Sequence, residues 1–170
     1  KAILTREQPA WKKVQMRTAL FLAFLLAAIG FAAWRGGGPE RAMAAIALGV
    51  VGADAILHRY IPVAFATLDV GHLAIDLFGA SATTALALCA HRFWPMIAAV
   101  LHVLPLMAHT SRMLDMELHP AAYLTMQVAA SWMVPPLLIL ATWRHQRRVR
   151  RGGSGPSWHV WGGASDPTRP

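Results

Sequence analysis

Residues 19–34 read ALFLAFLLAAIGFAAW, and this apolar stretch decides the class of the fold. It contains no charged side chain, and the Arg-Gly-Gly-Gly-Pro segment at 35–39 ends it. Four further apolar stretches follow, at 42–57, 68–90, 93–111 and 121–143. Repeated apolar runs separated by short polar connections are typical of membrane-spanning helices. The sequence therefore predicts an all-α, polytopic transmembrane helical bundle.

The overall composition indicates the same class. Of 170 residues, 56% are hydrophobic and 14% are charged, compared with about 25% charged in soluble proteins. The charged residues avoid the apolar stretches and gather at the two ends of the chain. The single cysteine, Cys89, excludes a disulfide framework and a Cys-x-x-Cys zinc site.

The formal net charge of +8 does not indicate a nucleic-acid partner. Of the sixteen Lys and Arg residues, five precede the first apolar stretch and six follow the last. Basic flanks of apolar helices determine membrane topology and contact anionic lipid head groups. We expect a basic segment at 1–17, a helical bundle at 18–143, and a tail at 144–170 that is basic and then rich in Gly, Ser and Pro.

The number of membrane crossings determines which side each end of the chain faces. The stretch at 42–57 has 16 residues, about 24 Å of helix, which is short for a bilayer. If it does not cross, twelve basic residues lie on one side and four on the other, whereas five crossings give nine and seven. The positive-inside rule therefore favours four full spans plus one short helix, with both termini in the cytoplasm. Five spans are the alternative.

Polar side chains follow one face of each of two neighbouring stretches. Residues 68–90 carry Asp69, His72 and Asp76 at intervals of three or four, and residues 93–111 and the position after them carry His102, His109 and Arg112 on one face. The short connection at 91–92 predicts an antiparallel hairpin, in which residues whose numbers sum to about 183 lie at equal depth. This register pairs Asp76 with His109 and Asp69 with Arg112.

Three interpretations of this polar face remain open. The first is a structural network that pairs buried charges, formed by Asp54, Asp69, His72, Asp76, His109 and Arg112. The second is a metal site with His72, Asp76 and His109 as ligands, because imidazole and carboxylate groups bind divalent metals. The third is a path for protons or ions along the Asp and His side chains.

A cofactor is a further alternative to the expectation that none is bound. The pattern Ala98-x-x-x-His102-x-x-x-Leu106 resembles the Ala/His motif by which light-harvesting polypeptides ligate bacteriochlorophyll. This resemblance implies a pigment at His102. Haem or bacteriochlorophyll held by His102 and His109 is thus the alternative prediction.

Three short phrases resemble a group of small bacterial membrane proteins without assigned function. They are WRGGGPER at 34–41, RFWP at 92–95 and TWRH at 142–145. The resemblance spans most of residues 30–145 in the order of its elements. It implies a polytopic bacterial membrane protein, and it implies no activity. We expect this protein to be a multi-pass protein of the bacterial inner membrane.

The sequence contains no nucleophile elbow, HExxH motif or P-loop, and its connections are short. We therefore expect no catalytic residue and no enzyme. We expect an accessory or structural subunit of a larger membrane complex, in photosynthetic or respiratory electron transport. Its partners would be other membrane subunits, contacted by Trp158 and Trp161, and lipids. The alternatives are a membrane protein that binds haem, pigment or metal, and a small component of ion or proton transport.

Overall fold

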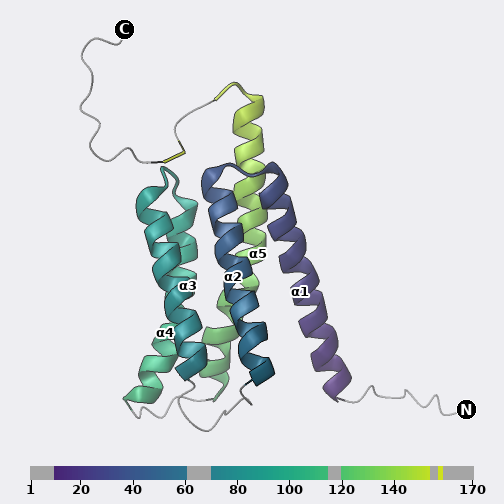
Figure 1. Cartoon of the computed structure of the whole chain (residues 1–170), viewed down its shortest axis with the longest axis vertical. Coiled ribbons are helices and arrows are strands. Elements are labelled where there is room, and N and C mark those ends of the chain that lie inside the picture. The colour runs from purple at the N-terminus through teal and green to yellow at the C-terminus, as the bar shows by residue number, and fades with distance from the viewer. Residues whose placement is uncertain (1–9, 61–69, 115–119, 154–156, 159–170) are drawn as a thin grey trace, which may run out of the picture.

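The computed structural model describes residues 10–60, 70–114, 120–153 and 157–158, and these residues form five α-helices and no strand. The helices are α1 (Ala10–Arg35), α2 (Gly38–Tyr60), α3 (Val70–Cys89), α4 (Trp94–Met113) and α5 (Pro120–Arg150). Successive helices run in opposite directions along the long axis of the molecule (Figure 1). The prediction of an all-α bundle is confirmed.

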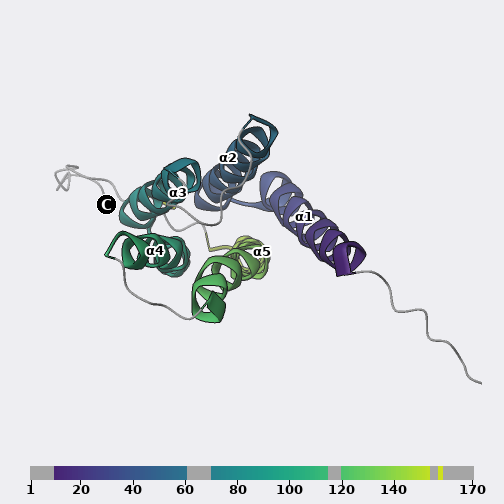
Figure 2. The ribbon, with the colours of Figure 1, turned by 90° about the horizontal axis from the view of Figure 1, so that it is seen from below.

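The five helices form a closed ring. Each helix packs on its neighbours in the chain, and α5 completes the ring by packing on both α4 and α1 (Figure 2). Many of the buried side chains are small: Ala28, Ala32 and Ala98 have no exposed surface. Small residues allow helix backbones to approach closely, which is how helices associate in lipid. The ring therefore brings side chains from helices distant in the sequence close together.

The turn between α1 and α2 is fixed by backbone and side-chain capping. Gly36 N donates to Ala32 O at 2.8 Å, which closes α1, and Arg41 N donates to Gly37 O at 3.0 Å, which opens α2. Glu40 Oε2 accepts a hydrogen bond from Gly37 N at 3.1 Å. A carboxylate that reaches back three residues in this way satisfies an amide that the helix leaves free. The second helix therefore begins at Gly38, before its apolar part.

The length of α2 differs from the prediction. It has 23 residues, about 34 Å of helix, which exceeds the ~30 Å hydrocarbon core of a bilayer. Among the described residues, three helices are long and apolar enough to cross a membrane: Val14–Arg35 within α1, α2, and α3. The predicted count of four full spans is not confirmed. The estimate from the sequence included only the apolar positions, whereas the capped turn at 38–41 and the polar turn at 58–60 also belong to the helix.

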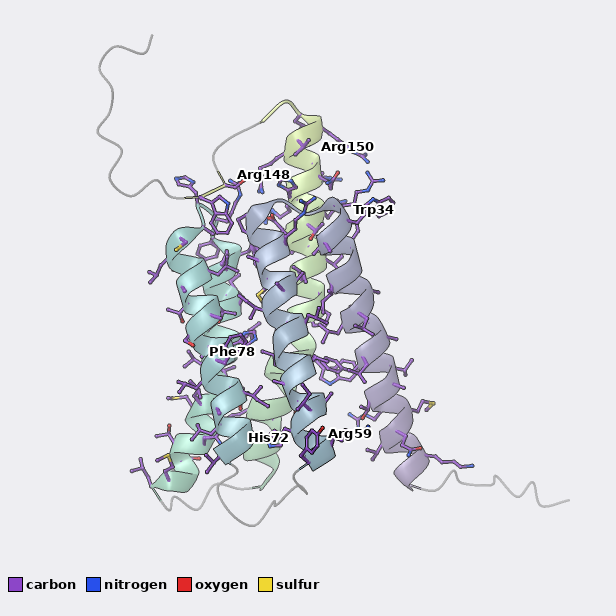
Figure 3. The ribbon with its side chains drawn as sticks, in the orientation of Figure 1. Trp34, Arg59, His72, Phe78, Arg148 and Arg150 are labelled. Carbon is purple, nitrogen blue, oxygen red and sulfur yellow. The ribbon has the colours of Figure 1, made fainter. Side chains whose placement is uncertain are left out.

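The two ends of the bundle differ in charge. We call one the arginine end, where α1 meets α2, α3 meets α4, and α5 finishes; the other is the His72 end. Eight basic residues lie in or next to the helices at the arginine end: Arg35, Arg41, Arg92, Arg144, Arg147, Arg148, Arg150 and Arg151. Five lie at the His72 end: Lys12, Lys13, Arg17, Arg59 and Arg112. Figure 3 shows Trp34, Arg148 and Arg150 at the first end and Arg59 and His72 at the second.

The start of α1 and the end of α5 lie at opposite ends of the bundle (Figure 1). If all five helices cross a membrane, these ends face opposite sides of it. The predicted cytoplasmic location of both termini would therefore require one helix that does not cross, and it stays a prediction.

The outer surface of the ring is apolar. Leu26 is 53% exposed, Leu77 57% and Val100 62%, although they belong to the middle parts of three different helices. A water-soluble bundle turns such side chains toward its interior. Their outward position is the arrangement that a helical membrane protein requires, because hydrocarbon surrounds them.

Candidate metal centre

A cavity of about 250 Å³ lies between the helices, in the half of the bundle nearer the His72 end, and all five helices contribute to its wall. Its apolar lining includes Phe21, Leu25, Ala47, Val50, Val51, Ile75, Pro105 and Val134. Its polar lining consists of Asp54, His72, Asp76, His102 and Ser131. The ring thus places two carboxylates and two imidazoles around one space inside an otherwise apolar bundle.

Three residues at the edge of this cavity form a cluster that we call the His/Asp cluster: Asp54, His58 and His72. The Oδ1 atom of Asp54 lies 3.4 Å from Nδ1 of His58 and 3.4 Å from Nε2 of His72. The imidazole rings of His58 and His72 stand nearly perpendicular, with centroids 5.1 Å apart. One possible ligand atom from each residue lies within 4.8 Å of the other two.

Local helix geometry explains how the cluster arises. Asp54 and His58 are four residues apart, so they lie on one face of the last two turns of α2. His72 lies in the first turn of α3, and α2 packs on α3. Two residues from the end of α2 and one from the start of α3 therefore meet at the same end of the bundle.

The spacing of the His/Asp cluster suits a transition-metal ion. A tetrahedral zinc ion with ligand bonds of about 2.0–2.1 Å holds its ligand atoms about 3.3 Å apart. The 3.4 Å between Asp54 Oδ1 and Nε2 of His72 is close to that value, and the ligand atom of His58 lies within 4.8 Å of both. Two histidines and one carboxylate are also a common donor set for zinc and for iron(II) sites that keep positions open for water or substrate.

One hydrogen bond prepares His58 for this role. Its Nδ1 lies 2.9 Å from the carbonyl oxygen of Asp54, which can only accept, so Nδ1 carries the proton. Its Nε2 then carries the lone pair that a metal needs. The side chains of the cluster are between 27% and 48% exposed, which leaves them open to an approaching ion.

A second polar contact lies deeper, between α3 and α4. His109 is 1% exposed, and its Nε2 lies 3.0 Å from Oδ2 of Asp76. This is the pair that the hairpin register predicts. The Nδ1 atom of His109 has no hydrogen-bond partner in the described part of the chain. The Asp76 carboxylate is therefore the polar group that holds this buried imidazole.

The predicted metal set of His72, Asp76 and His109 does not form one group of ligand atoms within the described residues. His72 contacts Asp54, while Asp76 contacts His109. The hairpin of α3 and α4 was the basis of that prediction, and it left out α2, which also packs on α3 and brings Asp54 to His72. The predicted metal set did not include His58, although its spacing of four from Asp54 is the same as that of His72 and Asp76.

His102 lines the cavity but has little room for a large cofactor. Its Nδ1 donates to the carbonyl oxygen of Ala98 at 2.8 Å, and a Cβ added at Gly79 would lie 2.8 Å from its Cδ2. The ring is thus packed against the backbone of α3. The cavity of about 250 Å³ lies below the ~300–1,000 Å³ of typical ligand pockets. His109 is covered and contacts Asp76. Haem or bacteriochlorophyll held by His102 and His109 stays a prediction.

Three further predictions concern residues whose structure is only partly described. Asp69 and Trp161 lie outside the described residues, and so does the side chain of Arg112, so the pairing of Asp69 with Arg112 stays a prediction. Trp158 is described: a Cβ added at Gly38 would lie 2.6 Å from its Nε1, and His91 N donates to Ser157 O at 3.1 Å. Trp158 therefore packs on its own chain at the arginine end, and its predicted contact with a partner subunit is untested.

Comparison of the chain with protein-family models, with curated proteins and with solved structures finds no match. The resemblance to small bacterial membrane proteins accordingly gains no support from these comparisons. The functional interpretation depends on the geometry of the site.

Proposed function

We propose that the chain is a membrane protein that binds a divalent transition-metal ion with Asp54, His58 and His72. The observation that supports this most directly is that one possible ligand atom from each of the three residues lies within 4.8 Å of the other two, with Asp54 Oδ1 3.4 Å from Nε2 of His72. A carboxylate between two imidazoles supplies one negative charge and two neutral nitrogen donors. That donor set lowers the energy of a divalent cation in a place where hydrocarbon surrounds the bundle.

The cavity next to the His/Asp cluster holds further donor atoms for an ion. Asp54 and His72 belong both to the His/Asp cluster and to the cavity wall, which continues to Asp76 and His102. An ion bound at the cluster would therefore have further oxygen and nitrogen donors within the same space. This supports binding at the edge of a polar interior rather than at an isolated surface site.

The test uses the full chain, purified in mild detergent and freed of metal with a chelator. Cobalt(II) is the first probe, because its visible absorption reports ligand type and geometry, and zinc then displaces it. We expect one ion per chain. The His58→Ala and His72→Ala variants should each weaken binding by more than about tenfold, since even loss of an outer-shell partner costs about 10–100-fold in metal affinity.

His91→Ala is the matched control, because it removes an exposed histidine from the opposite end of the bundle. It should bind cobalt and zinc like the unaltered chain. If the unaltered chain takes up no cobalt or zinc, or if His91→Ala weakens binding as much as His72→Ala, the cluster is not a metal site. It would then be a structural network of polar side chains.

The other functions expected from the sequence are not favoured by a particular contact. The apolar outer surface suits lipid and partner helices equally, so it does not single out an accessory subunit of a photosynthetic or respiratory complex. That role, and the role of a small ion or proton transport component, stay predictions. Isolation of the chain in mild detergent, with identification of co-purifying subunits, tests the first of them.

A further inference from the structure

A second pocket lies at the arginine end, along the seam between α1 and α5. It has a volume of about 420 Å³. Its wall contains three arginines and three aromatic residues: Arg35, Arg147, Arg150, Phe31, Trp34 and Trp143. It shares no residue with the cavity of the His/Asp cluster, so it raises a separate question of what it binds.

The charge of this second pocket is not balanced by its own wall. Three guanidinium groups line it, and the described residues around it include no acidic side chain. Glu40 lies at the same end of the bundle but is fully buried and accepts a hydrogen bond from Gly37. Three clustered cations without a local carboxylate favour an anionic ligand.

Aromatic rings hold two of the arginines in place. The guanidinium carbon of Arg35 lies 4.3 Å from the centre of the Trp34 ring, and that of Arg147 lies 3.8 Å from the Trp143 ring. Stacking against a ring uses the flat face of a guanidinium and leaves its N–H edge free. That edge forms paired hydrogen bonds with phosphate oxygens.

A contact between α1 and α5 fixes the pocket, which is also open to its surroundings. The side-chain amide of Gln146 donates to the carbonyl oxygen of Arg35, which ties α5 to the end of α1. Trp34 is 73% exposed, and Phe31 lies one turn deeper in α1. A polar upper part with an apolar part below it matches the level at which a lipid head group joins its acyl chains.

The distribution of basic residues between the two ends of the bundle indicates that this pocket faces the anionic cytoplasmic leaflet. The arginine end carries eight basic residues in or beside the described helices, and the His72 end carries five. By the positive-inside rule the richer end faces the cytoplasm, and the cytoplasmic leaflet is negatively charged. Basic pockets between helices on that side are positioned to contact anionic lipid head groups.

We infer that the pocket between α1 and α5 binds the phosphate-bearing head group of an anionic phospholipid. Arg35, Arg147 and Arg150 contact the phosphate, and the acyl chains descend along Phe31. A free phosphate ion would use the same arginines but would leave the apolar part of the pocket without a ligand. The lipid is therefore the ligand that matches the whole wall.

The experiment uses the full chain in mild detergent, with lipid binding measured by native mass spectrometry. Dioleoyl phosphatidylglycerol is compared with dioleoyl phosphatidylcholine, which has the same acyl chains and no net charge. We expect phosphatidylglycerol to bind at least about tenfold more tightly, since each hydrogen bond to a charged group contributes about 1.5–3 kcal/mol and about 1.4 kcal/mol is tenfold. Inorganic phosphate at equal concentration should not displace it.

The decisive comparison is between two double variants that remove equal charge from the same end. Arg147→Gln with Arg150→Gln alters the pocket and should weaken phosphatidylglycerol binding about tenfold or more. Arg41→Gln with Arg151→Gln alters exposed arginines outside the pocket and should change phosphatidylglycerol binding less than about threefold.

Circular dichroism checks that both variants fold. Should the first not fold, Arg147→Lys with Arg150→Lys replaces it, and we expect binding at least about threefold weaker because lysine lacks the forked donor.

Three results would overturn the inference. One is equal binding of the two lipids by the unaltered chain. Another is an equal loss of binding in both glutamine variants, which would mean that the general positive charge of this end attracts lipid. The third is displacement by inorganic phosphate at equal concentration, which would mean that the ligand is a soluble anion. If the lysine variant has to serve, binding equal to that of the unaltered chain would also overturn it.

Discussion

The Nε2 atom of His109 lies 3.0 Å from Oδ2 of Asp76, and this contact joins α4 to α3 inside the bundle. The His109 side chain is 2% exposed, whereas the Asp76 side chain is 26% exposed and also lines the central cavity. The buried partner thus depends on the more accessible one. Removing either residue leaves the other without its hydrogen bond.

This pair can be measured by a double-mutant cycle. Asp76→Leu and His109→Leu should each lower the free energy of unfolding by about 1–3 kcal/mol, because each leaves an unpaired polar group. The double variant should lose less than the sum, with a coupling energy of about 0.5–2 kcal/mol. Unfolding by sodium dodecyl sulfate in mixed micelles, followed by circular dichroism, gives the three values. Strictly additive losses would show that the hydrogen bond contributes nothing.

Gly79 is expected to tolerate no side chain. A Cβ there would lie 2.8 Å from Cδ2 of His102, whose ring is held by its bond to Ala98. Gly79→Ala should therefore destabilise the bundle by about 1–3 kcal/mol through overpacking, more than the ~1 kcal/mol that alanine gains in a helix.

The control for Gly79 is Gly52→Ala, because a Cβ at Gly52 has nothing within 4 Å. This variant should be neutral or more stable by up to about 1 kcal/mol. Thermal unfolding of both variants in the same detergent makes the comparison. The same shift in both would mean that His102 moves aside without cost.

Glu40 should contribute more to stability than the neighbouring charged residue. It has no exposed surface, and its Oε2 caps Gly37 N at the start of α2. Glu40→Ala is expected to destabilise the protein by about 1–3 kcal/mol, since the amide of Gly37 loses its partner and a buried space opens. Arg41→Ala, at an exposed position one residue later, should change stability by less than about 0.5 kcal/mol. Equal effects in the same unfolding assay would exclude a special role for the cap.

Gly38 should control the segment that carries Trp158. Because a Cβ at Gly38 would lie 2.6 Å from Nε1 of Trp158, Gly38→Ala should displace the indole from the arginine end. We expect faster cleavage by trypsin after Arg151, measured by mass spectrometry of the products over time. Gly30→Ala is the control, because a Cβ at Gly30 meets nothing within 4 Å. Unchanged cleavage in Gly38→Ala would mean that Trp158 does not hold the segment.

The sequence predicts contacts within a hairpin better than contacts between separate helices. The pairing of Asp76 with His109 follows from a short turn and the 3.6-residue helical period, both of which can be read from the residues between them. The sequence places Asp54 and His72 in one predicted network, but their direct contact could not be derived this way. It depends on how α2 packs on α3, and the helical period says nothing of that packing angle.

The ends of helices were also harder to predict than their middles. Hydropathy identified the apolar positions of α2, but the capping of Gly37 by Glu40 and the polar turn at 58–60 add residues that hydropathy alone does not assign to a helix. His58 belongs to that added turn, and it is the member of the His/Asp cluster that the predicted metal set left out. Capping signals deserve the same weight as hydropathy where a functional residue lies near a helix end.

Because all five helices line the central cavity, the His/Asp cluster and the cavity form at different stages of synthesis. The His/Asp cluster needs α2 and α3, so it can assemble while the rest of the chain is still being synthesised. The central cavity needs Ser131 and Val134 from α5, together with Phe21 and Leu25 from α1. A chain truncated before α5 would therefore contain the cluster without a complete central cavity. Until the last helix inserts, the incomplete bundle would be exposed to quality-control proteases.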